Sequence, residues 1–381
     1  MRQTDSARAR RTDSHSLRLE SLESRDVPAT LLVDSSPTSH TPYHQIQAAV
    51  NAAHPGDTIL VDPGTYREQV TIGSKDDGIK LVSVVEHGAS IVAPATLADP
   101  AAIVHVAGAH NVTVSGFTIR GPQPSLVAGV LVDQNGSAVI ADNNVADIRQ
   151  TAALSGNQTG YAVVVGGLTD SALNGTATIV ENTISGYQKA GILMYGSGSS
   201  ATIAGNIITG AGPTDVIAQN GIQVSYGASA DIVANLIAGN DYTPAGTEAT
   251  GILIGVGDPG TEAGRVDVSS NLLIGDEIGI AAQGQTAPLK ITGNIIVGSS
   301  QDGIWFDSVH GANVSGNIST GNGRSGIYVT GDSANNQFTG NYLRGNSGPD
   351  AYDDTHGTGT AGTADHWARN QLDDSQPSGL R

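Results

Sequence analysis

The sequence predicts an all-β fold, a single right-handed parallel β-helix. A ten-residue phrase recurs from about residue 103, with apolar residues at positions 1, 3 and 8, Asn at position 6 and Gly at position 10. A Gly-Ile pair recurs between the phrases, and successive pairs lie about 23 to 30 residues apart. Repeats of this length are typical of stacked arrays, in which each unit buries its apolar side against the next.

Each repeat is expected to form one coil of two or three short strands with alternating apolar residues. The clearest copies of the phrase occupy residues 177–186, 201–210, 231–239, 266–275, 289–298, 312–321 and 337–345. Parallel coils stack at about 4.8 Å, so roughly ten coils predict a rod about 45 Å long. Asn tolerates left-handed backbone, and stacked Asn amides bond to one another, so we expect the Asn column to be structural.

Composition narrows the class of protein. Gly reaches 50 residues while aromatic residues make up 4% and charged residues 14% of the chain, which fits short strands and turns. The net charge of −18 argues against nucleic-acid binding, because an acidic surface repels phosphates. There is no Cys, so neither disulfides nor thiol chemistry is expected, and no long apolar run predicts a membrane span.

Four segments follow from these patterns. Residues 1–29 are polar and Arg-rich and are expected to be a disordered targeting segment. Residues 30–56 form an N-terminal cap, whose helix begins near Thr41-Pro42 and places Ile46, Ala49 and Val50 on one apolar face. Residues 57–349 form the β-helix, and the Gly-rich residues 350–381 form a C-terminal cap or tail.

Two stretches resemble known families. The run from Ile46 to Tyr66, IQAAVNAAHPGDTILVDPGTY, resembles the cap and first coil of the pectin-lyase-like superfamily, and the later repeats resemble its generic right-handed β-helix repeat. The resemblance covers about residues 43–345. It implies a β-helix in a group that includes polysaccharide lyases, glycoside hydrolases, uronate epimerases, pectin esterases, tailspikes, adhesins and copper-chaperone-like proteins.

The end of the first segment resembles a leader. Residues 19–29, LESLESRDVPA, are similar to the LExLExRxxPA leader of secreted bacterial repeat proteins. This resemblance implies export, and therefore an extracellular or cell-surface location in a bacterium.

Alignment of the Gly-Ile strands predicts which side chains point outward. Trp305, Tyr328 and Tyr352 fall on successive coils of one outward column, and we expect them to form a flat apolar strip. Sugar rings stack on such strips, which makes extracellular polysaccharide the expected ligand. Tyr195 and Gln283 fall on the same face and complete the predicted substrate-binding set. The alternative is an aromatic ladder that only shields the sheet.

Acidic residues accompany the strip. Asp307, Asp332 and Asp354 are the candidate acids and bases, with His310 and Arg324 assisting. Asp307 and Asp354 lie two coils apart, roughly 9.5 Å, at the upper end of the carboxylate spacing for inverting glycoside hydrolysis. The same carboxylates could hold Ca²⁺ through hard oxygen ligands. The alternative is a solvated acidic edge without a catalytic role.

Two functions remain open from the sequence. The first is a secreted protein that binds or modifies extracellular polysaccharide, and if it is an enzyme it is a polysaccharide lyase or a glycoside hydrolase. The second is a non-catalytic surface or matrix protein whose rod serves as a spacer or adhesive scaffold. The lyase, polygalacturonase and esterase signatures of the superfamily are absent, which favours the second function, whereas the aromatic strip favours the first.

Two Met and no Cys argue against a copper-binding role. No cofactor other than calcium is expected, the metal is unknown, and the chain is expected to be a monomer.

Overall fold

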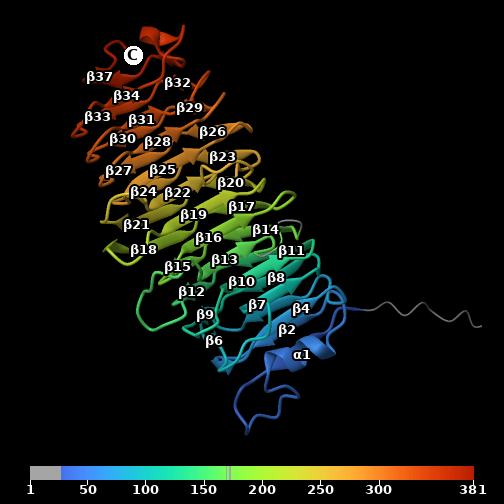
Figure 1. Cartoon of the computed structure of the whole chain (residues 1–381). Helices are drawn as coiled ribbons and strands as arrows, with labels where there is room; N and C mark the ends of the chain where they lie inside the picture. The colour runs from blue at the N-terminus through green and yellow to red at the C-terminus, as the bar shows by residue number, and fades with distance from the viewer. Residues whose placement is uncertain (1–26, 169, 171–172) are drawn as a thin grey trace, which may run out of the picture.

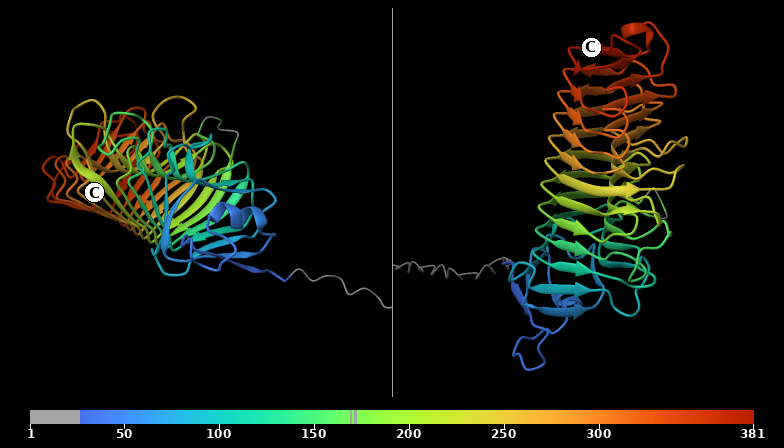
Figure 2. Two further views of the ribbon diagram at one scale, coloured as in Figure 1. Left: turned by 90° about the horizontal axis from the view of Figure 1, so that it is seen from below. Right: turned by 90° about the vertical axis from the view of Figure 1, so that its left-hand side faces the viewer.

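The computed structural model describes residues 27–168, 170 and 173–381 and forms one long rod of stacked coils (Figure 1). The predicted targeting segment therefore lies almost entirely outside the described residues. Three parallel sheets run along the rod, and the cap helix lies at its N-terminal end (Figure 2). The prediction of an all-β parallel β-helix with a short capping helix is confirmed.

The chain visits the three sheets in turn, A to B to C, and each strand pairs in parallel with the strand one coil later. Sheet A contains β1 (Thr30–Val33), β2 (Thr58–Val61), β5 (Lys80–Ser83), β8 (Val112–Ser115), β11 (Gly136–Ala141), β14 (Gly175–Val180), β17 (Ser200–Ala204), β20 (Ser229–Val233), β23 (Val266–Ser269), β26 (Leu289–Thr292), β29 (Asn313–Ser315), β32 (Gln337–Thr339) and β35 (His366–Ala368). Sheet B contains β3 (Gly64–Arg67), β6 (Ala89–Val92), β9 (Thr118–Arg120), β12 (Asn144–Ala146), β15 (Thr183–Ser185), β18 (Ile207–Thr214), β21 (Leu236–Tyr242), β24 (Leu272–Ile274), β27 (Ile295–Val297), β30 (Ile318–Thr320), β33 (Tyr342–Arg344) and β36 (Gln371–Leu372). Sheet C contains β4 (Val70–Gly73), β7 (Ala102–Ala107), β10 (Ala128–Asp133), β13 (Tyr161–Val165), β16 (Ala190–Tyr195), β19 (Asn220–Ser225), β22 (Thr250–Ile254), β25 (Ile278–Gln283), β28 (Ile304–Asp307), β31 (Ile327–Thr330), β34 (Ala351–Asp353) and β37 (Ser375–Gln376).

The rod has more coils than the roughly ten expected. Sheet A has 13 strands and sheets B and C have 12 each. The additional coils lie at the two ends. At the N-terminal end, β2 to β6 lack the repeated phrase. At the C-terminal end, β34 to β37 continue the sheets beyond residue 349, where the Gly-rich sequence suggested an irregular cap. These strands follow the register of their neighbours without a full copy of the phrase.

The core is a continuous column of aliphatic side chains. Inward-facing Ile, Val and Leu of all three sheets form one buried cluster from Val33 to Leu380. Near the C-terminal end, Phe338 stacks on Trp367 with ring centroids 4.1 Å apart, and Phe306 contacts Phe338 in a tilted arrangement with centroids 5.7 Å apart. These rings fill the core of the last coils, where the strands are two to four residues long.

The turn from sheet A to sheet B carries a ladder of buried Asn side chains. In each coil the Asn Nδ2 donates to the Oδ1 of the Asn one coil later, at 2.9 to 3.1 Å. The ladder comprises Asn143, Asn182, Asn206, Asn235, Asn271, Asn294, Asn317, Asn341 and Asn370. The left-handed backbone falls on the residue before the Asn, as at Glu181 (φ 57°) and Ser270 (φ 57°), and not on the Asn itself. The Asn is therefore selected for its amide.

The N-terminal cap contains α1 (Ile46–Ala52), which buries Ile46, Ala49 and Val50 against the first coil. The helix begins at Ile46, later than the expected start at Thr41-Pro42. The carboxylate of Glu68, from the first coil, accepts the backbone N–H groups of Ile46 and Gln47 at 2.8 Å each. A distant residue thus satisfies the free amides of the first turn and fixes where the helix starts. No helix among the described residues has the length and apolar character needed to cross a membrane.

Candidate functional site

The insertions between strands gather at the two edges of sheet C. From β8 onward, every A-to-B turn has two residues, such as 181–182 and 293–294. The B-to-C and C-to-A connections vary and reach 14 residues at 147–160 and 12 residues at 354–365, respectively. Loops that rise from both edges of one sheet border its outer face, and binding residues are often found on such loops, which makes sheet C the candidate face.

The outward column on sheet C keeps strict register along the rod. Its members pair in turn across the sheet: Leu131, Val164, Leu193, Gln223, Leu253, Ala281, Trp305, Tyr328 and Tyr352. A second outward column places Gln283, Asp307 and Thr330 side by side. The alignment of the Gly-Ile strands therefore predicted the register of Trp305, Tyr328 and Tyr352 correctly.

Loops cover the N-terminal half of this face. Leu131, Val164 and Leu193 point outward yet are buried in a second apolar cluster, against which Tyr195 packs. Tyr195 also contacts Tyr226, with ring centroids 4.4 Å apart. Tyr195 lies four strands from Trp305, roughly 19 Å along the rod, so it does not extend the aromatic strip.

The C-terminal half of the face carries the aromatic strip, defined as Trp305, Tyr328 and Tyr352. All three side chains are partly exposed. The Tyr328 and Tyr352 rings lie 5.0 Å apart, and Trp305 Nε1 donates to Thr330 Oγ1 at 3.2 Å. That hydrogen bond satisfies the indole N–H and fixes the ring, which leaves an ordered apolar surface on successive coils.

Arg324 joins the strip to a polar edge. Its guanidinium carbon lies 4.5 Å from the Tyr328 ring centroid, and its Nη1 lies 3.2 Å from both Asp302 Oδ2 and Gln301 Oε1. Gln301 Nε2 donates to Glu277 Oε1 at 2.6 Å. The predicted assisting residue Arg324 thus contacts the predicted platform directly.

Two carboxylates on this edge have raised pKa values. Burial raises the pKa of Glu277 to about 7, although hydrogen bonds from Ala249 and Gln301 oppose the rise. Burial likewise raises the pKa of Asp302 to about 6, and the Arg324 charge opposes it. Sequence reasoning did not select these residues. The available signal was a charged residue in the turn before a Gly-Ile strand, at Asp302-Gly303-Ile304.

The predicted acid and base residues do not converge. Asp307 Oδ1 accepts from Ser308 Oγ at 3.1 Å, while Asp332 is exposed. Asp354 lines a pocket of about 230 Å³ together with Tyr352 and His356. Within the described part of the chain, no hydrogen bond or ion pair links these carboxylates to one another or to His310, and no three His, Asp or Glu side chains gather into a metal-holding group. A calcium site has no counterpart there.

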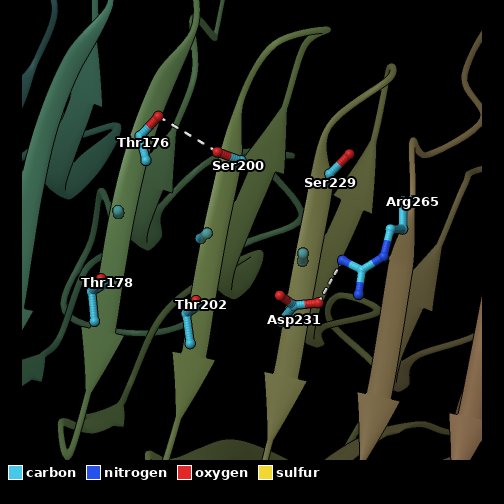
Figure 3. A pocket seen from close by; sticks show the side chains of 10 residues that line it. Thr176, Thr178, Ser200, Thr202, Ser229, Asp231 and Arg265 are labelled. Atoms are coloured by element: carbon cyan, nitrogen blue, oxygen red, sulfur yellow. Dashed lines mark hydrogen bonds and ion pairs between the residues drawn. The ribbon is translucent and has the colours of Figure 1, made fainter.

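The other two faces offer different chemistry. Sheet A has a hollow of about 220 Å³ lined by hydroxyls such as Thr176 and Ser200 (Figure 3). The charges in that hollow are paired, since Arg265 Nη1 lies 2.7 Å from Asp231 Oδ1. Sheet B exposes an aliphatic row in which Leu272, Ile295 and Ile318 are paired across the sheet. Sheet C alone combines partly exposed aromatic rings with buried carboxylates among the described residues.

The family follows from a comparison with known families. A model described as "Right handed beta helix region" matches residues 167–361, about half of the chain. The chain belongs to the right-handed β-helix family. A second model, "Periplasmic copper-binding protein (NosD)", matches residues 50–252. No curated protein matches this β-helix protein.

Solved structures support the same fold. The catalytic unit of a GH87 α-1,3-glucanase from Streptomyces thermodiastaticus is 15% identical with a TM-score of 0.59, covering 86% of this β-helix protein and 66% of the glucanase unit. The mannuronan C-5 epimerase AlgE4 A-module of Azotobacter vinelandii is 15% identical with a TM-score of 0.56. The match covers 87% of this β-helix protein and 91% of the epimerase module. The Dettilon tailspike is 15% identical with a TM-score of 0.64. The match covers 91% of this β-helix protein and 68% of the tailspike. At this identity the likeness establishes the pectin-lyase-like fold and not the reaction.

The residues of this β-helix protein do not fit a copper centre. Copper sites are built from thiolate, thioether and imidazole ligands. The chain has no Cys and two Met, and the described residues contain no metal-holding group that includes His. The match to the copper-binding family model spans part of α1 and the coils from β2 to β22.

Proposed function

We propose that this β-helix protein binds extracellular polysaccharide along the outer face of sheet C, with the aromatic strip as its platform. The observation that carries the proposal is the register of Trp305, Tyr328 and Tyr352 on three successive coils, with rings held by Thr330 and Arg324. Gln283 supplies a neighbouring amide for sugar hydroxyls. The protein acts outside the cytoplasm, as the leader resemblance and the periplasmic family match suggest.

Modification of the glycan is the finer part of the proposal. Asp307, Asp332 and Asp354 remain the proposed acids and bases, with His310 and Arg324 assisting. A second candidate function, a non-catalytic surface scaffold, is favoured by the lack of any contact among those carboxylates in the described part of the chain. The test incubates the protein with acidic and neutral polysaccharides, with and without Ca²⁺, and measures reducing ends and unsaturated uronate. Release of either product supports an enzyme, and retention without product supports the scaffold.

Replacing Trp305 by Ala is expected to weaken glycan retention about tenfold or more, equivalent to about 1.4 kcal/mol. Tyr328→Ala should act in the same direction, because both substitutions remove ring surface that a sugar would cover. Affinity electrophoresis in glycan-containing gels measures the effect.

Tyr342→Ala is the matched control. Tyr342 lies on sheet B, is 39% exposed and has Arg344 5.7 Å from its ring, so it repeats the Tyr–Arg pair on a different face. Its replacement should leave retention unchanged. Equal loss of retention in Tyr328→Ala and Tyr342→Ala would contradict the choice of face.

A further inference from the structure

A pocket lies on the N-terminal half of sheet C, far from the aromatic strip. It has a volume of about 190 Å³ and is lined by Pro100, Val127, Leu131, Asp133 and Leu168, among others. β10 and β28 are six strands apart in sheet C, roughly 29 Å. Ligand pockets for drug-sized molecules span roughly 300–1,000 Å³, so this pocket has room for about one ring.

A buried His–Asp hydrogen bond lies beside the pocket. His105 on β7 and Asp133 on β10 are each 4% exposed, and His105 Nε2 lies 2.7 Å from Asp133 Oδ1. Asp133 lines the pocket, and its Oδ2 makes no hydrogen bond to the described residues but keeps access to solvent. A carboxylate that is mostly buried and has one oxygen open to the pocket favours a ligand with a hydrogen-bond donor.

The lining restricts the ligand by charge. Among the described residues of the lining, Asp99 and Asp133 are the charged ones, and none is Lys or Arg. A uronate would bring its own carboxylate beside Asp133, which is unfavourable in a partly apolar site. A ring with hydroxyl or ammonium donors would bind the free oxygen, while Leu131, Val127 and Leu168 would contact its C–H face.

We infer that this pocket binds one neutral or amino-sugar residue, with Asp133 as acceptor and His105 as the residue that positions it. The inference rests on the proposed function and deepens it, because pocket and strip lie on the same face of sheet C. It excludes an all-uronate polymer as the preferred ligand.

Titration calorimetry with three oligosaccharide probes tests the inference: a neutral glucan, a glucosamine oligomer and an oligogalacturonate. The wild-type protein should bind one of the first two about tenfold or more tightly than the oligogalacturonate. Asp133→Asn, which keeps the size and one acceptor oxygen, should reduce that discrimination severalfold, with the largest loss for the glucosamine oligomer. The His105 imidazole NMR signal should also shift on binding, and it should still shift in Trp305→Ala.

Asp231→Asn, on sheet A, is the control and should leave the preference unchanged. A melting temperature for each variant separates loss of folding from loss of selectivity. Equal affinity for the three probes, or retained discrimination in a folded Asp133→Asn, would overturn the pocket while leaving the strip intact. Failure of the wild type to bind any glycan would instead overturn the proposed function.

Discussion

Replacing Asn294 by Ala is expected to lower the free energy of unfolding by about 3 to 5 kcal/mol, because several buried polar groups lose their partners at once. Asn294 Oδ1 accepts the backbone N–H and the Nδ2 of Asn271, at 2.9 and 3.0 Å. Its Nδ2 donates to the carbonyl of Val268 and to Asn317 Oδ1, both at 3.0 Å. Alanine replaces none of these bonds, and the Asn294 side chain is fully buried.

Asn313→Ala provides the matched control for this substitution. Asn313 lies on the outer face of sheet A and is exposed, so the same change should alter stability by less than about 0.5 kcal/mol. Urea unfolding followed by far-ultraviolet circular dichroism measures both variants. Similar midpoints for Asn294→Ala and the wild type would show that the ladder does not hold the coils together.

Replacing Asp276 by Asn is expected to stabilise the protein at pH 8 by up to about 4 kcal/mol and to have little effect at pH 4. Burial raises the pKa of Asp276 to about 7, against hydrogen bonds from Asn240 at 2.9 Å. Its Oδ2 is buried without a partner among the described residues. Between the unfolded pKa near 3.8 and the folded value, the folded state holds more protons, so stability falls as pH rises through this window.

The variant removes this penalty because an amide carries no charge at any pH in the window. The stability difference between Asp276→Asn and the wild type should therefore grow from pH 4 to pH 7 and then level off. Asp332→Asn, at an exposed site, should show no such growth. A constant difference across the window would mean that Asp276 does not carry the raised pKa.

The repeat made the coil architecture and the outward columns predictable. The Gly-Ile pair marks the start of the sheet C strands from β16 to β31, so counting two residues onward from each Gly gives Trp305 and Tyr328 in register. The end coils were not predictable in number, because β2 to β6 and β34 to β37 follow the stacking without the phrase that marks the middle. Coil stacking imposes register even where the sequence signal fades.

The environment of the site was less predictable, because it depends on loops and on neighbouring coils. His105 and Asp133 are 28 residues apart and meet only because adjacent coils stack. Tyr195 has the spacing of an exposed platform residue but packs against the apolar cluster beneath the loops. Burial of Glu277 and Asp302 likewise depends on the coils above and below their turns, which no local pattern reports.

Tryptophan fluorescence during glycan titration tests the central claim, that the aromatic strip on the outer face of sheet C binds polysaccharide. The chain has two Trp residues. Trp367 is 3% exposed and donates to Asp353 Oδ2 at 2.8 Å, so it serves as a silent internal reference, whereas Trp305 is partly exposed on the strip. The account predicts a saturable change in emission with the wild type and none with Trp305→Phe. A glycan that binds without changing Trp305 emission would contradict it.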